Sequence, residues 1–138
     1  DSNNAGIVFP SGSRSVLFFS RHGYGSPTYK QDDGCGGGDG EGASPYRRQI
    51  TAFDANDLLA VKNGTKNPWD IRPYAWWEVP GPSDSCGKFA YSGLAYDPLS
   101  RRIYGAFDYG ESPKIHVWQV SGEPAAAPPA PPQDVRVK

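Results

Sequence analysis

The chain has 138 residues, which suits one domain of ordinary size, and its formal net charge of -1 leaves no electrostatic footprint for nucleic acid or a membrane surface. Its 17 glycines, 14 prolines and 13% aromatic residues favour short strands joined by turns over a helical bundle. No apolar run approaches the roughly 18 residues of a membrane-spanning helix, so we expect no membrane insertion and no nucleic-acid partner.

The N-terminal part of the chain predicts two strands and a long loop. Residues 6–10 predict a short strand, and residues 15–20 form a continuous apolar run after a turn. A run of this length is typical of a strand that is buried on both faces. Residues 21–27 predict a cluster of turns. Residues 28–46 are rich in glycine and cannot build a core, so we predict a long loop there.

The middle of the chain predicts a strand, a short helix and a further strand. Residues 47–54 show strand alternation. Asp54 and Asn56 are candidate N-caps for one or two helical turns over residues 54–62, which Asn63-Gly64 ends. The following segments are an irregular connector, a strand and a turn, at residues 67–73, 74–79 and 80–87.

The stretch Gly93–Gly110 repeats the pattern of the N-terminal strands at an offset of 87 residues. A strand predicted at residues 114–120 matches residues 49–54 at an offset of 65. The first copy therefore carries 87 − 65 = 22 extra residues, which form the glycine-rich loop, and one such insertion is compatible with a repeat architecture. The paired positions are Gly93 with Gly6, Leu94 with Ile7, Ala95 with Val8, Tyr96 with Phe9, Arg101 with Arg14, Ile103 with Val16, Tyr104 with Leu17, Gly110 with Gly23, Ile115 with Ile50 and Trp118 with Phe53.

The two ends of the chain differ from this repeat. Residues 123–138 predict an extended, semi-rigid Pro/Ala linker and a truncated tail that begins another strand. This segment resembles the linker and first strand that introduce a fibronectin type III domain in secreted bacterial proteins. The chain contains no Met and opens on Asp1 without a signal-peptide pattern. We therefore expect a processed or truncated start and an extracytoplasmic location: secreted, periplasmic or at the cell surface.

The repeated unit of strand, turn, strand and outer strand resembles the blades of secreted bacterial β-propellers. The resemblance covers residues 6–120 and rests on Gly-apolar-apolar-aromatic followed by Arg-x-apolar, and on Ile-His-Val-Trp-Gln-Val at 115–120. It implies an all-β fold of two propeller-like antiparallel sheets, or blades, with long loops and little helix. The blades would occupy about residues 6–80 and 88–120 of a domain at residues 1–122. The alternative is a compact, self-sufficient two-sheet sandwich.

The number of blades bears on the partners of the chain. Propellers have four to eight blades, whereas this sequence encodes about two. Two blades leave apolar faces and strand edges exposed. We therefore predict part of a larger assembly, formed by a longer polypeptide or by a subunit that pairs with copies of itself.

The two cysteines and the acidic residues of the glycine-rich loop are candidates for covalent and metal bonds. We favour a disulfide between Cys35 and Cys86 over two free thiols, because exposed thiols are uncommon where oxidation is possible. Hard oxygen ligands on a glycine-rich loop suit Ca²⁺, although a solvated loop without metal is the favoured alternative. The candidate calcium ligands are Asp32, Asp33, Asp39 and Glu41.

Aromatic and polar residues supply the candidate binding site. Exposed aromatic rings stack on sugars or anchor protein partners. Trp76 and Trp77 must point to opposite faces of a strand, so we expect at least one of them in the core. The candidate binding residues are Trp69, Tyr29, Tyr24, His22 and Arg21, and Asn63 opens a glycosylation sequon.

The familiar sequence signatures of catalysis are missing from the chain, and we assign no catalytic residue. A triad of Ser26, His22 and Asp32 can be drawn, but sequence spacing gives it no support. The predicted function is a non-catalytic extracytoplasmic module for protein binding or assembly, with other chains or copies of itself as partners. The alternative is a fragment of a propeller-type carbohydrate-active enzyme or a glycan-binding protein.

Overall fold

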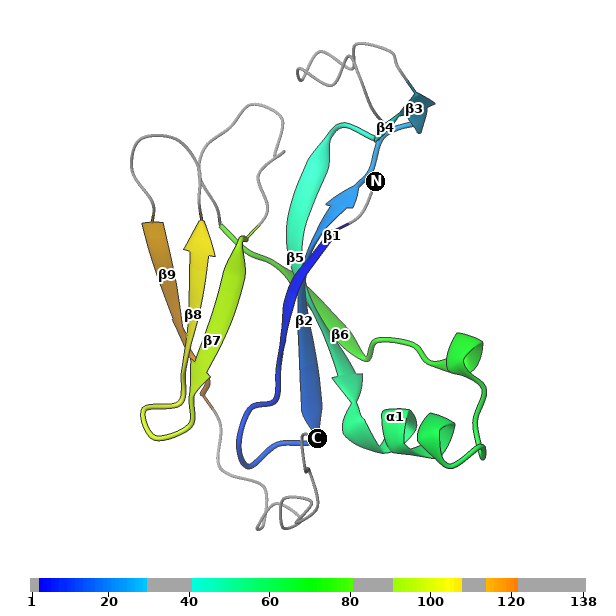
Figure 1. Ribbon diagram of the computed structural model, residues 1–138, viewed down its shortest axis with the longest axis vertical. Helices are drawn as coiled ribbons and strands as arrows, with labels where there is room; N and C mark the ends of the chain where they lie inside the picture. The colour runs from blue at the N-terminus through cyan, green and yellow to red at the C-terminus, as the bar shows by residue number, and fades with distance from the viewer. Residues whose placement is uncertain (1–2, 30–40, 81–90, 108–113, 122–138) are drawn as a thin grey trace, which may run out of the picture.

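The computed structural model describes residues 3–29, 41–80, 91–107 and 114–121. These residues form mostly β-strands with one α-helix, so the predicted all-β class is confirmed (Figure 1). The first sheet has the strand order β1-β2-β5-β6, with bounds Asn3–Val8, Ser15–Gly23, Tyr46–Asp54 and Ala75–Glu78. The second sheet has the order β7-β8-β9, with bounds Gly93–Asp97, Arg102–Phe107 and Lys114–Gln119. A small hairpin pairs β3 (Thr28–Tyr29) with β4 (Glu41–Gly42).

The two sheets repeat the same antiparallel registers. In the first sheet Val8 pairs with Leu17, and in the second Ala95 pairs with Tyr104. Both members of the pair are displaced by 87 residues. The next pairing repeats as well, because Val16 pairs with Phe53 and Ile103 pairs with Trp118, at offsets of 87 and 65. The strands β1, β2 and β5 are thus the counterparts of β7, β8 and β9.

The hydrophobic core lies between the two sheets. Its buried side chains come from both: Val8, Phe19 and Ile50 from the first sheet, Ile103 and Phe107 from the second, and Tyr91 from the residues before β7. Phe19 packs on Trp118, with ring centroids 5.4 Å apart. At the edge, the missing side chain of Gly6 lets β1 approach β7 closely, because a Cβ atom there would lie 2.8 Å from Leu94 Cδ1.

Strand β2 is buried on both faces at its centre, as its unbroken apolar run predicts. Val16 and Phe19, whose side chains point to opposite faces, are both inaccessible to solvent. The strand continues to Gly23, so the turn predicted from residue 21 begins later. The segment predicted as a long loop over residues 28–46 contains the pairing of β3 with β4.

The helix α1 (Ala55–Lys62) has the caps that the sequence predicts. Asp54 is the N-cap, and its carboxylate accepts a hydrogen bond from the Asn56 backbone N–H at 2.9 Å. Asn63 is the C-cap, followed by Gly64 at a φ of 71°. A short 3₁₀-helix (Pro68–Asp70) follows within the predicted irregular connector. Among the described residues, no helix is long and apolar enough to cross a membrane.

The expectation that Trp76 or Trp77 lies in the core is wrong. The two rings do point to opposite faces of β6, since Trp76 pairs with Thr51 and Trp77 with Ile50. Both, however, remain exposed, at 56% and 49% of their surface. The reason is that β6 is a short strand at the edge of the first sheet, where it pairs with β5 on one side.

Candidate functional site

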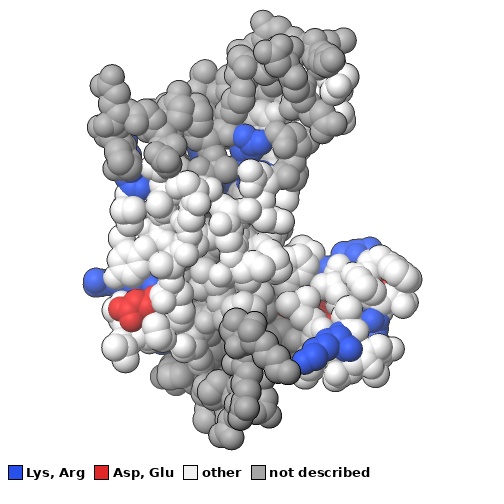
Figure 2. Space-filling model, viewed as in Figure 1, with Lys and Arg blue, Asp and Glu red and all other residues white. Residues whose placement is uncertain are grey.

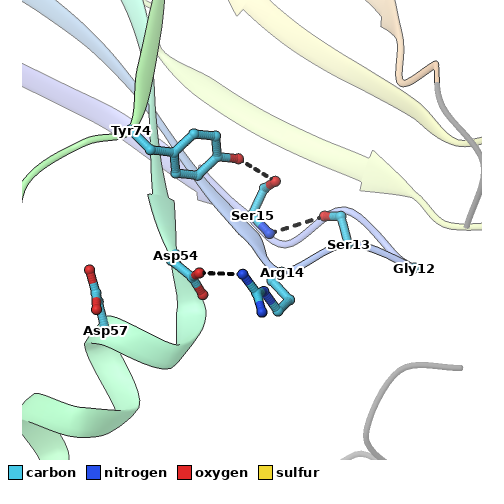
Figure 3. A pocket seen from close by; sticks show the side chains of 7 residues that line it. All are labelled: Gly12, Ser13, Arg14, Ser15, Asp54, Asp57 and Tyr74. Carbon is cyan, nitrogen blue, oxygen red and sulfur yellow. Dashed lines mark hydrogen bonds and ion pairs between the residues drawn. The ribbon is translucent and has the colours of Figure 1, made fainter. Parts of the chain in front are cut away.

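A groove opens at the end of the first sheet where three segments of the chain meet (Figure 3). The β1–β2 turn forms one wall, the start of α1 another, and the residue before β6 a third. The groove has a volume of about 730 Å³. Its lining residues are Gly12, Ser13, Arg14, Ser15, Asp54, Asp57 and Tyr74.

The charged side chains of this groove are already paired. The Arg14 guanidinium donates to Asp54 Oδ2 at 2.8 Å, while the other oxygen of this carboxylate caps α1. Asp57 accepts a hydrogen bond from the Lys66 ammonium group at 2.8 Å. Both carboxylates therefore have a cationic partner within the chain.

The hydroxyl groups and the aromatic ring give the groove its binding character. The hydroxyls of Ser15 and Tyr74 share a hydrogen bond at 2.5 Å, and the Ser13 hydroxyl accepts one from the Ser15 backbone N–H at 3.2 Å. The Tyr74 ring is exposed beside them. An exposed ring next to hydrogen-bonding groups offers a stacking surface for a polar ring such as a sugar.

The predicted binding residues Arg21, His22 and Tyr24 do not form a single site. Arg21 and His22 are adjacent in β2 and point to opposite faces. The Arg21 guanidinium lies 4.5 Å from the centre of the Tyr46 ring. His22 pairs with Arg47 in the sheet, and its Nε2 atom is buried without a hydrogen-bond partner among the described residues.

Tyr24 belongs to a polar cluster at the same end of the sheet. The Arg47 guanidinium lies 4.7 Å from the centre of the Tyr24 ring and forms an ion pair with Glu78 at 2.9 Å. The Gln49 amide donates a hydrogen bond to the Tyr24 hydroxyl. Arg47, Gln49 and Glu78 escaped the sequence analysis because only the pairing of β5 with its two neighbours brings them together.

The remaining predicted binding residues lie far apart. Trp69, in the 3₁₀-helix, and Tyr29, in β3, are both largely exposed. Figure 1 shows the β3–β4 hairpin and helix α1 at opposite ends of the first sheet, so the structure does not bring these two rings together. Asn63 is exposed at the end of α1, where a glycan would not disturb the core.

Several candidate residues fall outside the part of the chain that the structure describes. These are Asp32, Asp33, Asp39, Cys35, Cys86 and the linker at 123–138. Glu41, the fourth candidate calcium ligand, belongs to β4 and pairs with Tyr29 through the backbone. Within the described ranges, no group of three or more His, Cys, Asp or Glu side chains is placed to hold a metal ion.

Each sheet also has a second face that points away from the other sheet, on which apolar side chains lie among polar ones. We call the first outer face the side of the first sheet that carries Ile7, Phe18, Phe53 and Trp76. We call the second outer face the side of the second sheet that carries Gly93, Ala95, Tyr104, Ala106, Ile115 and Val117. Uncharged side chains also dominate the middle of the view in Figure 2, while several Lys and Arg side chains gather on the α1 lobe.

No protein-family model matches the chain, and neither a curated protein nor a solved structure is similar to it. The groove and the two outer faces are therefore the features of the molecule that bear on its function.

Proposed function

We propose that the chain is a non-catalytic, extracytoplasmic module of propeller-like β-repeats that serves in protein binding or assembly through its outer faces. The observation that carries this proposal is a difference between equivalent positions. Ile50 is 8% exposed because it packs in the core between the two sheets, and Ala52 on the same face is 0% exposed, whereas their counterparts Ile115 and Val117 are 59% and 51% exposed. The same apolar positions thus lack in the second copy the cover that they have in the first.

Exposed apolar patches of this kind mark interaction surfaces. The solvent-facing side of an ordinary antiparallel sheet carries polar residues. Ile115 and Val117 on an exposed sheet face are therefore unexpected for a domain that acts alone. The two loop cysteines and the predicted linker support an extracytoplasmic location.

The mass of the native particle tests this proposal. Light scattering and native mass spectrometry of the purified particle should give a mass well above one chain, with the outer faces protected from surface labelling. A native particle with the mass of a single chain and with both faces freely labelled would overturn the assembly function.

A second candidate function is glycan binding in the groove, and the exposed Tyr74 ring beside the hydroxyls of Ser13 and Ser15 favours it. A glycan array should then show binding that Tyr74→Ala abolishes. Trp69→Ala and Tyr29→Ala are the matched controls, since these exposed aromatic residues do not line the groove. Binding that persists in Tyr74→Ala but disappears in Trp69→Ala would place the ligand on the α1 lobe instead.

A further inference from the structure

The interface inside the chain joins two different kinds of sheet face. The first sheet contributes the face of Phe19 and Ile50, and the second contributes the face of Ile103 and Trp118. The shared registers make each of these the counterpart of one of the two outer faces. Phe19 corresponds to Ala106 on the second outer face, and Trp118 corresponds to Phe53 on the first outer face. One face of each kind therefore takes no part in the interface between the two sheets.

The glycines show the same relation. Gly6 is packed so closely that an added Cβ atom would meet Leu94 at 2.8 Å. Its counterpart Gly93, on the second outer face, has no atom within 4 Å of an added Cβ. The counterpart of Leu94 is Ile7, an exposed residue of the first outer face. Gly93 thus leaves room for a close approach by a residue such as Ile7.

Side-chain sizes on the two outer faces are complementary, but large and small residues occupy the reverse positions from those at the interface inside the chain. Inside the chain, Phe19 packs on Trp118. The Trp118 ring lies over Gly105, where a Cβ atom would be only 2.7 Å from the nearest ring carbon. The counterpart of Phe19 is the small Ala106, and the counterpart of Gly105 is the large Phe18. The second outer face thus has a small residue where the first sheet has Phe19, and the first outer face has a large residue where the second sheet has Gly105. Phe18 packs edge-on against Phe53 on the first outer face, at 5.3 Å between ring centroids, and both rings are partly exposed.

We propose that copies of this chain associate head to tail, with the second outer face of one copy packed on the first outer face of the next. This inference rests on the proposed assembly function and names its partner. Such a contact is heterologous, so it forms a ring where the rotation between copies closes and a filament where it does not. With two sheets per copy, closure at the four to eight sheets of known propellers requires roughly two to four copies.

The complementary variants Ile7→Lys and Val117→Lys test the head-to-tail arrangement. Each places one charge on one outer face at a position that is already half exposed, so both chains should remain folded. Wild-type chain should form an oligomer in sedimentation velocity at concentrations up to roughly 100 μM, and each variant alone should be monomeric. An equimolar mixture should give a 1:1 dimer and nothing larger, because only one intact pair of faces remains.

Two controls separate this result from a general effect of added charge. Leu99→Lys, in the exposed β7–β8 turn, should assemble as the wild type does. The double variant Ile7→Lys/Val117→Lys should stay monomeric with either single variant. Where Val117→Lys prevents folding, Gly93→Leu replaces it on the same outer face, because this change fills the space for Ile7 of the next copy and an added Cβ meets nothing within 4 Å in its own chain.

The head-to-tail contact is overturned if the wild-type chain stays monomeric, if the mixed variants fail to pair, or if either single variant still dimerises. The mass of the native particle distinguishes this failure from that of the proposed function. A heavy native particle without self-association would leave the assembly function standing with a different partner, whereas a single-chain particle would remove both.

Discussion

Replacing Gly105 with alanine tests how the second sheet packs on the first. A Cβ atom at Gly105 would lie 2.7 Å from a ring carbon of Trp118 and 3.0 Å from Tyr91. The Trp118 ring cannot turn aside easily, because it packs on Phe19 and on Tyr91, each at 5.4 Å between centroids. Overpacking of this kind lowers the free energy of unfolding by about 1–3 kcal/mol. Alanine also reduces the conformational entropy of the unfolded chain, which offsets about 0.4–1 kcal/mol of that loss. We expect a net loss of about 1–2 kcal/mol in the free energy of unfolding.

The matched control is Gly93→Ala in the same sheet, where an added Cβ has no neighbour within 4 Å. This variant should keep its stability or gain up to about 1 kcal/mol. Urea unfolding of dilute, monomeric chain, followed by circular dichroism, gives both values from midpoints at a constant slope. In a Trp118→Leu background the cost of Gly105→Ala should shrink, because the two sites are coupled. Equal stability of the two glycine variants would refute the packing of Trp118 over Gly105.

Three further predictions concern side chains outside this contact. Asp54→Ala removes the cap of α1 and the partner of Arg14, and should cost about 1 kcal/mol in urea unfolding; Asp54→Asn, which keeps a capping oxygen, should cost less. Burial raises the pKa of the Tyr91 hydroxyl above its ordinary value of 10.0, so the stability that its neutral form contributes is complete below pH 10 and declines as the pH rises further. Tyr91→Phe should therefore flatten the alkaline decline in Tm, and an unchanged decline would contradict this assignment. The Ser100 hydroxyl, bonded to Asp97 at 2.5 Å, is the main cause that lowers the pKa of this carboxyl below 3.8. Asp97→Ala should reduce Tm at neutral pH, and its difference from the wild type should vanish in strong acid, since the contribution is lost as the pH falls through the folded-state pKa.

The repeat and the helix could be predicted from sequence because their signals are local and periodic. Side chains alternate along a strand, so matching residues at a constant offset implies matching registers, as the pairs Val8–Leu17 and Ala95–Tyr104 show. The helix has its signals at its ends, where Asp54 accepts a backbone hydrogen bond and Asn63 stops the helix.

The site could not be predicted in the same way because it depends on contacts between distant segments. Arg14 and Asp54 are 40 residues apart and meet only because β2 and β5 pair. The opposite orientations of Arg21 and His22 were hidden by the prediction of a turn there, since alternation applies only within a strand. The exposure of Trp77 follows from the edge position of β6, which hydropathy does not reveal.

Residues 24–45 connect β2 to β5, whereas only residues 108–113 connect β8 to β9, and the longer connection carries the β3–β4 hairpin at one end of the first sheet. The helix α1 lies at the opposite end of that sheet (Figure 1). A head-to-tail ring would therefore have two chemically distinct rims, with every hairpin on one and every helix on the other. Ligands that repeat along a polymer or a cell surface would meet several identical sites on the same rim. Multivalent attachment of this kind raises the overall avidity far above the affinity of a single site, so a contact too weak to detect with the isolated chain would become effective once the ring had formed.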